Sequence, residues 1–281
     1  MVKKQQVILV SSGFLVLILL FFFGNTIPPK KPATVAANTP HQEKKIETEK
    51  LLTHAKERLT PQQLQKVTSL ENSVKRGDVK NQQLAVYRQL ASFWGDSIKL
   101  FEPYAFYTAQ QAKLENSEKS LTFAAHLFLN NLKTESDPPM QNWLATNAKD
   151  LFQQALQLNP ANDSSKIGLG ACYIFGNISE NPMEGIASIR EVVQRNPDNM
   201  FGQMILGLGG VKSGQFDRAI ERFAIIADKQ PDNLEALLNL AEAYDQKGDK
   251  ANAMKWYKAV KEKISNPEAQ KELDLRIKAL Q

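Results

Sequence analysis

The chain has 281 residues and 42 % of them are hydrophobic, so it is long and apolar enough to bury a sizeable core. Its formal net charge is +5, but residues 1–31 contain four lysines and no acid, so the rest of the chain is nearly neutral. This distribution excludes the basic footprint of a nucleic-acid-binding protein. The single cysteine, Cys172, excludes an intramolecular disulfide and a zinc site built from cysteines.

The first predicted elements are a short tail over residues 1–6 and a transmembrane helix over residues 7–27. Val7–Phe23 contains no charged residue. The stretch to Ile27 makes about 31 Å of helix at ~1.5 Å per residue, which matches a bilayer core of roughly 30 Å. A cleaved signal peptide is the alternative, but the apolar run is long and no small-x-small cleavage signal follows it. The short tail favours a cytoplasmic N-terminus. We therefore expect a single-pass protein of the bacterial inner membrane with its body on the periplasmic side.

Residues 28–47 are predicted to form a linker, because they contain four prolines, several alanines and no apolar periodicity. Residues 48–117 then place apolar side chains at three- and four-residue spacings, which is the period of amphipathic helices. Thr60-Pro61 predicts the start of a helix that runs to about Lys75. A turn at residues 75–78 and a second helix over Gln82–Trp94 follow. We interpret this region as degenerate helical hairpins.

An internal repeat occupies the next part of the chain. Asn-Pro or Gln-Pro recurs with spacings of 37, 34 and 36 residues between the prolines, which are Pro160, Pro197, Pro231 and Pro267. A large residue beside a very small one stands in the first helix of each unit, as at Leu206-Gly207. In the second helix, Ala219 and Phe223 are four residues apart and lie on one helix face. Ala253 and Tyr257 repeat this pair 34 residues later.

This pattern of small, large and aromatic residues closed by proline resembles the tetratricopeptide repeat (TPR) family. Met200–Asn233 and Leu234–Pro267 are the best units, and Asp163–Asn199 is a third with a short insertion. A fourth unit is split between Leu121–Leu132 and Trp143–Pro160, with residues 134–142 predicted as an extra loop. The resemblance implies TPR repeats over residues 118–266 and a capping helix over residues 267–281. The expected fold is all-α: a right-handed superhelical stack of antiparallel helix hairpins, a TPR solenoid, behind the N-terminal transmembrane helix.

The residue types that carry catalysis or bind cofactors occur without the required spacing. His41, His54 and His126 have no partner at metal-ligand spacing, so we expect no metal site. The glycines of Gly168–Gly170 and Gly207–Gly210 lack the Lys-Ser/Thr or the preceding strand of a phosphate-binding loop. We interpret them as helix-contact positions, and Cys172 as a buried thiol. We therefore expect no enzyme, no cofactor, no nucleic acid and no small-molecule substrate.

In the TPR family the first helix of each unit lines the concave side, where partners bind. By resemblance, the peptide-binding groove consists of Thr122, His126, Leu129, Ile167, Ala171, Ile174, Phe201, Met204, Leu208, Leu238, Glu242 and Asp245. Its middle is apolar and its far end is acidic, which suits an apolar peptide or amphipathic helix flanked by basic residues. The alternative is that Phe201 and Met204 belong to the core. The Lys, Arg and Asn residues with which some TPR grooves grip a terminal carboxylate are not found at these positions.

These features predict a membrane-anchored, non-catalytic scaffold that binds protein or peptide partners through its concave surface. One alternative is an envelope assembly or maturation factor, similar in plan to the TPR proteins of cytochrome c maturation. An alternative of a different class is a regulatory subunit of a membrane enzyme.

Overall fold

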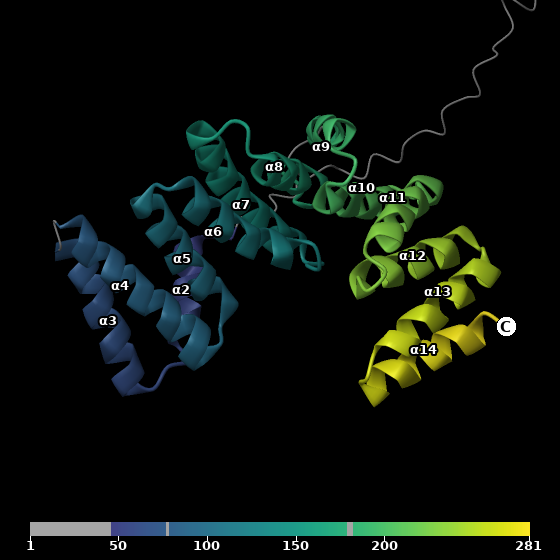
Figure 1. Cartoon of the computed structure of the whole chain (residues 1–281). Helices are drawn as coiled ribbons and strands as arrows, with labels where there is room; N and C mark the ends of the chain where they lie inside the picture. The colour runs from purple at the N-terminus through teal and green to yellow at the C-terminus, as the bar shows by residue number, and fades with distance from the viewer. Residues whose placement is uncertain (1–45, 77–78, 179–181) are drawn as a thin grey trace, which may run out of the picture. The chain divides into compact units, whose positions relative to one another are not determined.

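The computed structural model describes residues 46–76, 79–178 and 182–281. Contacts divide the chain into residues 1–43 and 44–281, and every described residue belongs to the second unit. All regular elements of the described residues are helices, in agreement with the predicted all-α class (Figure 1). They are α2 (Thr48–Lys56), α3 (Pro61–Arg76), α4 (Lys80–Ser92), the π-helical segment η1 (Phe93–Ile98), α5 (Phe101–Glu115), α6 (Glu118–Leu132), α7 (Pro138–Leu158), α8 (Asp163–Phe175), α9 (Met183–Arg195), α10 (Met200–Lys212), α11 (Phe216–Lys229), α12 (Leu234–Lys247), α13 (Lys250–Lys263) and α14 (Pro267–Ala279).

From α3 onward consecutive helices pack against one another, whereas α2 packs against α5. The tightest pairs are α6 with α7, α8 with α9, α10 with α11 and α12 with α13, which form helical hairpins (Figure 1). The first helices of successive hairpins also touch, because α6 contacts α8, α8 contacts α10 and α10 contacts α12. This is a solenoid of hairpins, as the sequence predicts. The right-handed superhelix and the transmembrane helix stay predictions, and the latter lies outside the described residues.

Asparagine side chains set the start of the first helix in three successive hairpins. Asn162, Asn199 and Asn233 each accept a hydrogen bond through Oδ1 from the backbone N–H three residues later, at 2.8, 2.9 and 3.0 Å. Such caps satisfy backbone donors that have no partner inside the helix. Each of these asparagines stands two residues after the proline that ends the preceding unit. The proline step and the cap together explain why each new helix begins where it does.

The preceding helix ends because proline restricts the residue before it. Asn159, Asn196 and Gln230 precede the three prolines and adopt nearly the same backbone conformation, with φ from −140° to −132° and ψ from 72° to 89°. This conformation lies outside the helical region, as expected for a residue before proline. Each still donates its N–H to the carbonyl four residues earlier, so the last helical turn stays bonded.

Small residues bring the two helices of each hairpin into close contact. A Cβ placed at Gly207 would lie 2.4 Å from Cε1 of Phe223, so only glycine leaves room for the aromatic ring. In the preceding hairpin, a Cβ at Gly170 would lie 2.6 Å from the carbonyl oxygen of Gly185. The prediction that these glycines are helix-contact positions is confirmed. Gly214 and Gly248 serve differently, since their φ values of +70° and +85° provide the left-handed turns that glycine favours.

Two boundaries differ from the prediction. The loop predicted over residues 134–142 ends at Asp137, whose carboxylate accepts from the Met140 N–H and caps α7. Pro138 and Pro139 occupy the first helical positions, where a missing N–H is tolerated, so they start the helix and do not interrupt it. The helix predicted over Gln82–Trp94 is α4, which starts two residues earlier and continues without a break into the π-helical segment η1.

The buried side chains form three clusters along the chain. One joins α2 to α5, a second extends from α5 to α10, and a third runs from α10 to α14. Leu208 of α10 packs against both the second and the third cluster and so links them. The residues predicted to form the capping helix make up α14, which buries Leu273 and Ile277 in the third cluster.

Candidate functional site

The predicted groove residues lie on α6, α8, α10 and α12, and we call the side of these helices that carries them the inner face. Its first half is closed by the protein itself. Ile167 and Ala171 of α8 are fully buried, and Leu129 of α6 is buried with them. Ile174 is also buried, with 7 % of its surface exposed. These residues belong to the core, which corrects their expected role as groove lining.

Side chains from α6 and α10 meet directly and account for this burial. The His126 ring of α6 makes an edge contact with the Phe201 ring of α10, with centroids 5.3 Å apart. It makes a second edge contact with Phe152 of α7 at 5.2 Å. Edge-to-face packing is the favoured geometry for such rings. The aromatic group spans the hairpins on either side of α8 and leaves little of the α8 inner face open.

A row of polar side chains joins α6 to the start of α8 beside this aromatic group. His126 Nε2 lies 2.8 Å from Ser164 Oγ, and Thr122 Oγ1 lies 2.9 Å from the fully buried Ser165 Oγ. Asn162, the cap of α8, donates through Nδ2 to Glu118 of α6. Burial lowers the pKa of His126 below its usual range, and the nearby Lys133 ammonium lowers it further. His126 is therefore a neutral packing and hydrogen-bonding residue at neutral pH.

The second half of the inner face, on α10 and α12, is more open. Met204 is buried with 7 % exposed, whereas Phe201, Leu208 and Leu238 are half-buried and present apolar surface to solvent. Burial of Met204, and the packing of Phe201 against the second cluster, agree with the alternative that both belong to the core. The accessible apolar surface of the inner face is centred on Leu208 and Leu238.

The acidic end of the inner face has partners within the chain. Glu242 accepts a hydrogen bond from the Arg276 guanidinium of α14 at 2.8 Å, and both side chains are 41 % exposed. Asp245 accepts from the Tyr257 hydroxyl at 3.4 Å. The predicted acidity of this end is thus partly neutralised by α14. Sequence reasoning missed Arg276, although its repeat position, 34 residues after Glu242, was a usable signal.

An ion pair crosses between helices that are far apart in sequence. Lys133, which follows α6, places its Nζ 3.4 Å from Oε1 of Glu235 in the first turn of α12. The Lys133 side chain is only 19 % exposed, whereas that of Glu235 is 54 % exposed. The two residues are 102 positions apart, so the pair joins the first and the last of four successive hairpins.

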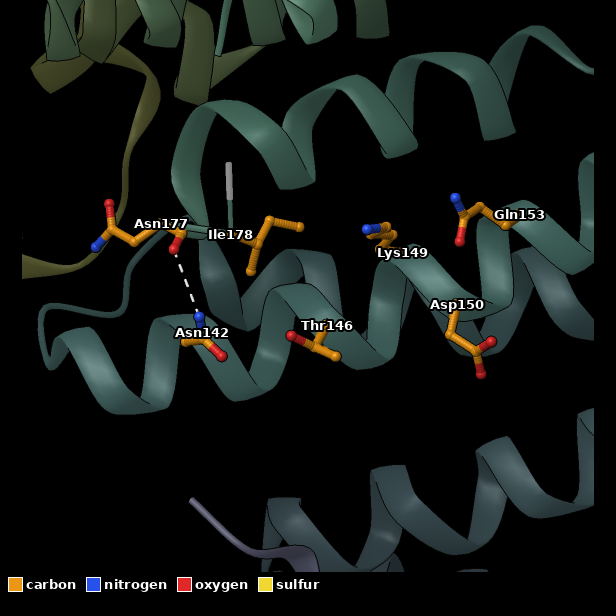
Figure 2. A pocket seen from close by; sticks show the side chains of 7 residues that line it. All are labelled: Asn142, Thr146, Lys149, Asp150, Gln153, Asn177 and Ile178. Atoms are coloured by element: carbon orange, nitrogen blue, oxygen red, sulfur yellow. Dashed lines mark hydrogen bonds between the residues drawn. The ribbon is translucent and has the colours of Figure 1, made fainter. Parts of the chain in front are cut away.

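An open hollow of about 590 Å³ lies beside α7, and none of the predicted groove residues lines it (Figure 2). Its lining is Asn142, Thr146, Lys149, Asp150, Gln153, Asn177 and Ile178. Its charged groups are engaged elsewhere, because Lys149 lies over the Tyr173 ring and Asp150 pairs with Lys113 at 2.6 Å. The hollow therefore offers no convergent set of free functional groups.

Catalytic and metal chemistry has few candidate residues in the part of the chain that the structure describes. No group of three or more His, Cys, Asp or Glu side chains within that part is arranged to hold a metal ion. Cys172 is fully buried, as predicted, and burial raises the pKa of its thiol to about 12. Among the described helices, none has the length and apolar character needed to cross a bilayer. The predicted anchor over residues 7–27 lies outside them.

Residues 206–267, from the middle of α10 to the first residue of α14, match the family model for the tetratricopeptide repeat. The match covers about a fifth of the chain, and this segment is similar to the tetratricopeptide repeat. The matched TPR segment contains Leu208, Leu238, Glu242 and Asp245 of the inner face. The unit boundaries that we assigned outside this segment stay predictions. No curated protein matches the chain.

Several solved structures, one of them described as a TPR protein, are similar in fold to the chain. PilW, a widely conserved type IV pilus biogenesis factor, is 17 % identical, with a TM-score of 0.48 over 72 % of this chain and 94 % of PilW. MamA from Desulfovibrio magneticus RS-1, from residue 41 to its end, is 20 % identical, with a TM-score of 0.45 over 66 % of this chain and 96 % of that chain. YrrB, a TPR protein with an unusual peptide-binding site, is 15 % identical, with a TM-score of 0.42 over 73 % of this chain and 97 % of YrrB.

Proposed function

We propose that the chain is a membrane-anchored, non-catalytic scaffold that binds a protein or peptide partner on the inner face of α10 and α12. The observation that carries the proposal is the half-buried apolar surface of Leu208 and Leu238 within the matched TPR segment. Glu235 and Glu242 lie on α12 together with Leu238, and their side chains stay 54 % and 41 % exposed beside Lys133 and Arg276. A partner segment with apolar residues flanked by basic ones fits this combination, because it buries the apolar surface and meets the carboxylates.

The apolar stretch over residues 7–27 supports the anchoring part of the proposal. In this arrangement the body works on the periplasmic side of a bacterial inner membrane, tethered by the linker over residues 28–47. The scaffold would hold its partner at the membrane surface. A regulatory subunit of a membrane enzyme would use the same surface, and the identity of the partner distinguishes the two functions.

Site-specific photocrosslinking tests the partner site. A benzophenone amino acid replaces Leu238 in the full-length chain, and a matched control carries it at Leu275, which is 57 % exposed on α14. Irradiation of cells is expected to give a discrete adduct from position 238 and none of the same mass from position 275. Identical adducts from both positions, or none from position 238, would rule out the inner face as the binding surface.

Thiol labelling tests the location of the body. Cys172 is buried and its pKa is raised, so it reacts slowly and the wild-type chain is a low background. Leu158→Cys places a thiol at the exposed end of α7. A membrane-impermeant maleimide is expected to label this variant in intact spheroplasts. Labelling only after lysis would place the body in the cytoplasm and overturn this part of the proposal.

A further inference from the structure

A small cavity opens between α9 and α11 above the middle of α10, with a volume of about 70 Å³. Apolar side chains line it from three helices, among them Ile174, Ile186 and Leu206. Gly209 and Gly210 of α10 complete this part of the lining without side chains. At about 100° per residue, Leu206 and Gly210 lie on nearly the opposite side of α10 from Phe201, Met204 and Leu208. On α10 the cavity therefore lies on the side away from the inner face, and Ile174 of α8 is the one groove residue that also lines it.

Three arginines line the same cavity, whereas none of the described residues that line it is acidic. Arg222 of α11 donates to Oε1 of Gln203 at 3.2 Å, and its nearest carboxylate, that of Glu221, is 3.8 Å away and 62 % exposed. Arg218 donates to Oε1 of Gln215 at 2.6 Å. These partners are mainly neutral amides, so they orient the guanidinium groups without cancelling their charge.

The third arginine, Arg190 of α9, makes no hydrogen bond or ion pair with any other described residue and is exposed at the rim. Gln203, which holds Arg222, is itself fixed, because it is 1 % exposed and donates to the Pro197 carbonyl at 2.9 Å. A buried amide thus fixes one guanidinium at the cavity, while a second is left free to meet a ligand. Guanidinium groups bind carboxylates through two parallel hydrogen bonds.

The size of the cavity limits what it can bind. At about 70 Å³ the cavity matches a carboxylate in size and is too small to enclose a nucleotide or sugar. The exposed Met183 side chain and the apolar lining offer a contact for a neighbouring apolar group. We propose that this cleft between α9 and α11 binds an acidic side chain of a protein partner, next to an apolar residue of the same segment. This second docking surface goes beyond the inner-face function and does not depend on it.

The test uses the full-length chain in detergent with labelled Ile, Leu and Met methyl groups. The probe is the peptide acetyl-Leu-Glu-Leu-amide, and the matched control peptide has Gln in place of Glu. The Glu peptide is expected to shift the methyl signals of Ile186, Leu206 and Met183. It should bind about ten-fold more tightly than the Gln peptide, because a charge-assisted hydrogen bond contributes that much. Equal binding of the two peptides, or shifts confined to Leu238, would overturn the proposal.

Variants identify the groups responsible. Arg190→Gln together with Arg222→Gln is expected to reduce binding of the Glu peptide to the level of the Gln peptide. Arg195→Gln is the matched control, because Arg195 also lies on α9 but pairs with Asp163 and does not line the cavity. If the double variant unfolds by circular dichroism, Arg190→Gln alone serves, since Arg190 has no partner to lose among the described residues. Unchanged binding in a folded Arg190→Gln variant contradicts the proposal.

Two further titrations test whether the cavity prefers another kind of anion to the acidic peptide. Inorganic phosphate, and micelles doped with phosphatidylglycerol, are titrated against the same methyl signals. The proposal expects weaker shifts from both than from the Glu peptide. Stronger binding of phosphate would make this a general anion site, and stronger binding of phosphatidylglycerol would make it a lipid-headgroup site. Either result would overturn the assignment to an acidic protein segment.

Discussion

The repeats at the C-terminal end and the helices at the N-terminal end are stabilised by different means. In the first helices of the repeats, α8, α10 and α12, an asparagine caps the N-terminus and a glycine or alanine admits the neighbouring helix. In contrast, α2, α4 and α5 begin without a side-chain cap. There, the Tyr107 hydroxyl donates to Glu71, and Lys56 lies 2.6 Å from the same carboxylate.

This contrast shows how locally each region encodes its structure. In α8, α10 and α12, the cap acts on a backbone N–H three residues later and the close helix contact lies within one repeat unit, so the same solution recurs. In the N-terminal helices, the central polar contact joins residues 36 positions apart and occurs once. The buried Trp94 indole N–H there has no hydrogen-bond partner among the described residues, and no buried side-chain polar atom in the described part of the repeats lacks one. We expect substitutions in the two regions to differ accordingly.

The largest effect is expected from Phe223→Ala in the repeats. The ring is fully buried and fills the space left by Gly207, so its removal creates a cavity in the third cluster. The expected loss is about 3–5 kcal/mol of unfolding free energy. Urea unfolding of the full chain in detergent, followed by circular dichroism, measures it. Phe123→Ala is the control, because Phe123 is 57 % exposed and should change stability by no more than about 0.5 kcal/mol. Equal effects would mean that Phe223 does not hold the hairpin together.

The next largest effect is expected in the N-terminal helices from Tyr107→Phe, at about 1–3 kcal/mol at pH 7, because Glu71 loses its buried donor. Burial raises the pKa of Tyr107 above its usual value, and the hydrogen bond to Glu71 raises it further. A raised pKa gives stability that is present below the unfolded pKa of about 10 and is lost as the pH rises beyond it.

Because the Phe variant lacks this group, the difference in stability between wild type and variant should shrink when unfolding is measured at pH 10.5. A constant difference at both pH values would show that Tyr107 is not ionising differently in the folded and unfolded chains.

Removing a helix cap in the repeats should lower stability, whereas adding one in the N-terminal helices should raise it. Asn199→Ala removes the acceptor for the Gly202 N–H and should cost about 1 kcal/mol. Val79→Asp adds an acceptor before α4, where Val79 is 47 % exposed and has the extended backbone of a cap, and should stabilise by up to about 1 kcal/mol. Thermal unfolding midpoints compare them. Loss of stability in the Val79 variant would mean that the start of α4 is not limited by its missing cap.

The smallest effect is expected from the surface ion pairs of the repeats. Lys263 and Asp232 are 2.6 Å apart, but their side chains are 36 % and 90 % exposed. Lys263→Gln should therefore cost at most about 1 kcal/mol, and 0.5 M NaCl should remove the difference. A larger, salt-independent loss would indicate that this pair is part of the packing between helices.

The same contrast explains how much was predictable from the sequence. The hairpins, the role of Gly207 and the turn at Gly214 were predictable because repetition distinguishes packing residues from variable ones. The start of α7 at Pro138 was missed because two prolines were interpreted as a loop, although Asp137 ahead of them is a capping signal. The Tyr107–Glu71 contact has no sequence signal, since no repeat or local spacing relates the two residues.

The candidate site was less predictable than the fold. Helical spacing placed Ile167 and Ala171 on the inner face, but it cannot show that His126 and Phe201 meet over that face. Arg218 and Arg222 of α11 line the cavity beside α9, and the repeat pattern alone does not show this. Burial and cavities depend on how successive hairpins are placed, and that placement is set by tertiary packing.

The ion pair between Lys133 and Glu235 changes how the array should melt. In a linear array each unit touches only its neighbours, so a boundary between folded and unfolded units can stop at any junction. A tie between α6 and α12 adds an interaction that is lost whichever of the intervening hairpins opens. The pair contributes at most about 1 kcal/mol, because Glu235 is 54 % exposed, but that contribution favours opening of α6 to α12 as one block. The helices outside this block, which are α2 to α5, α13 and α14, are then free to fray first.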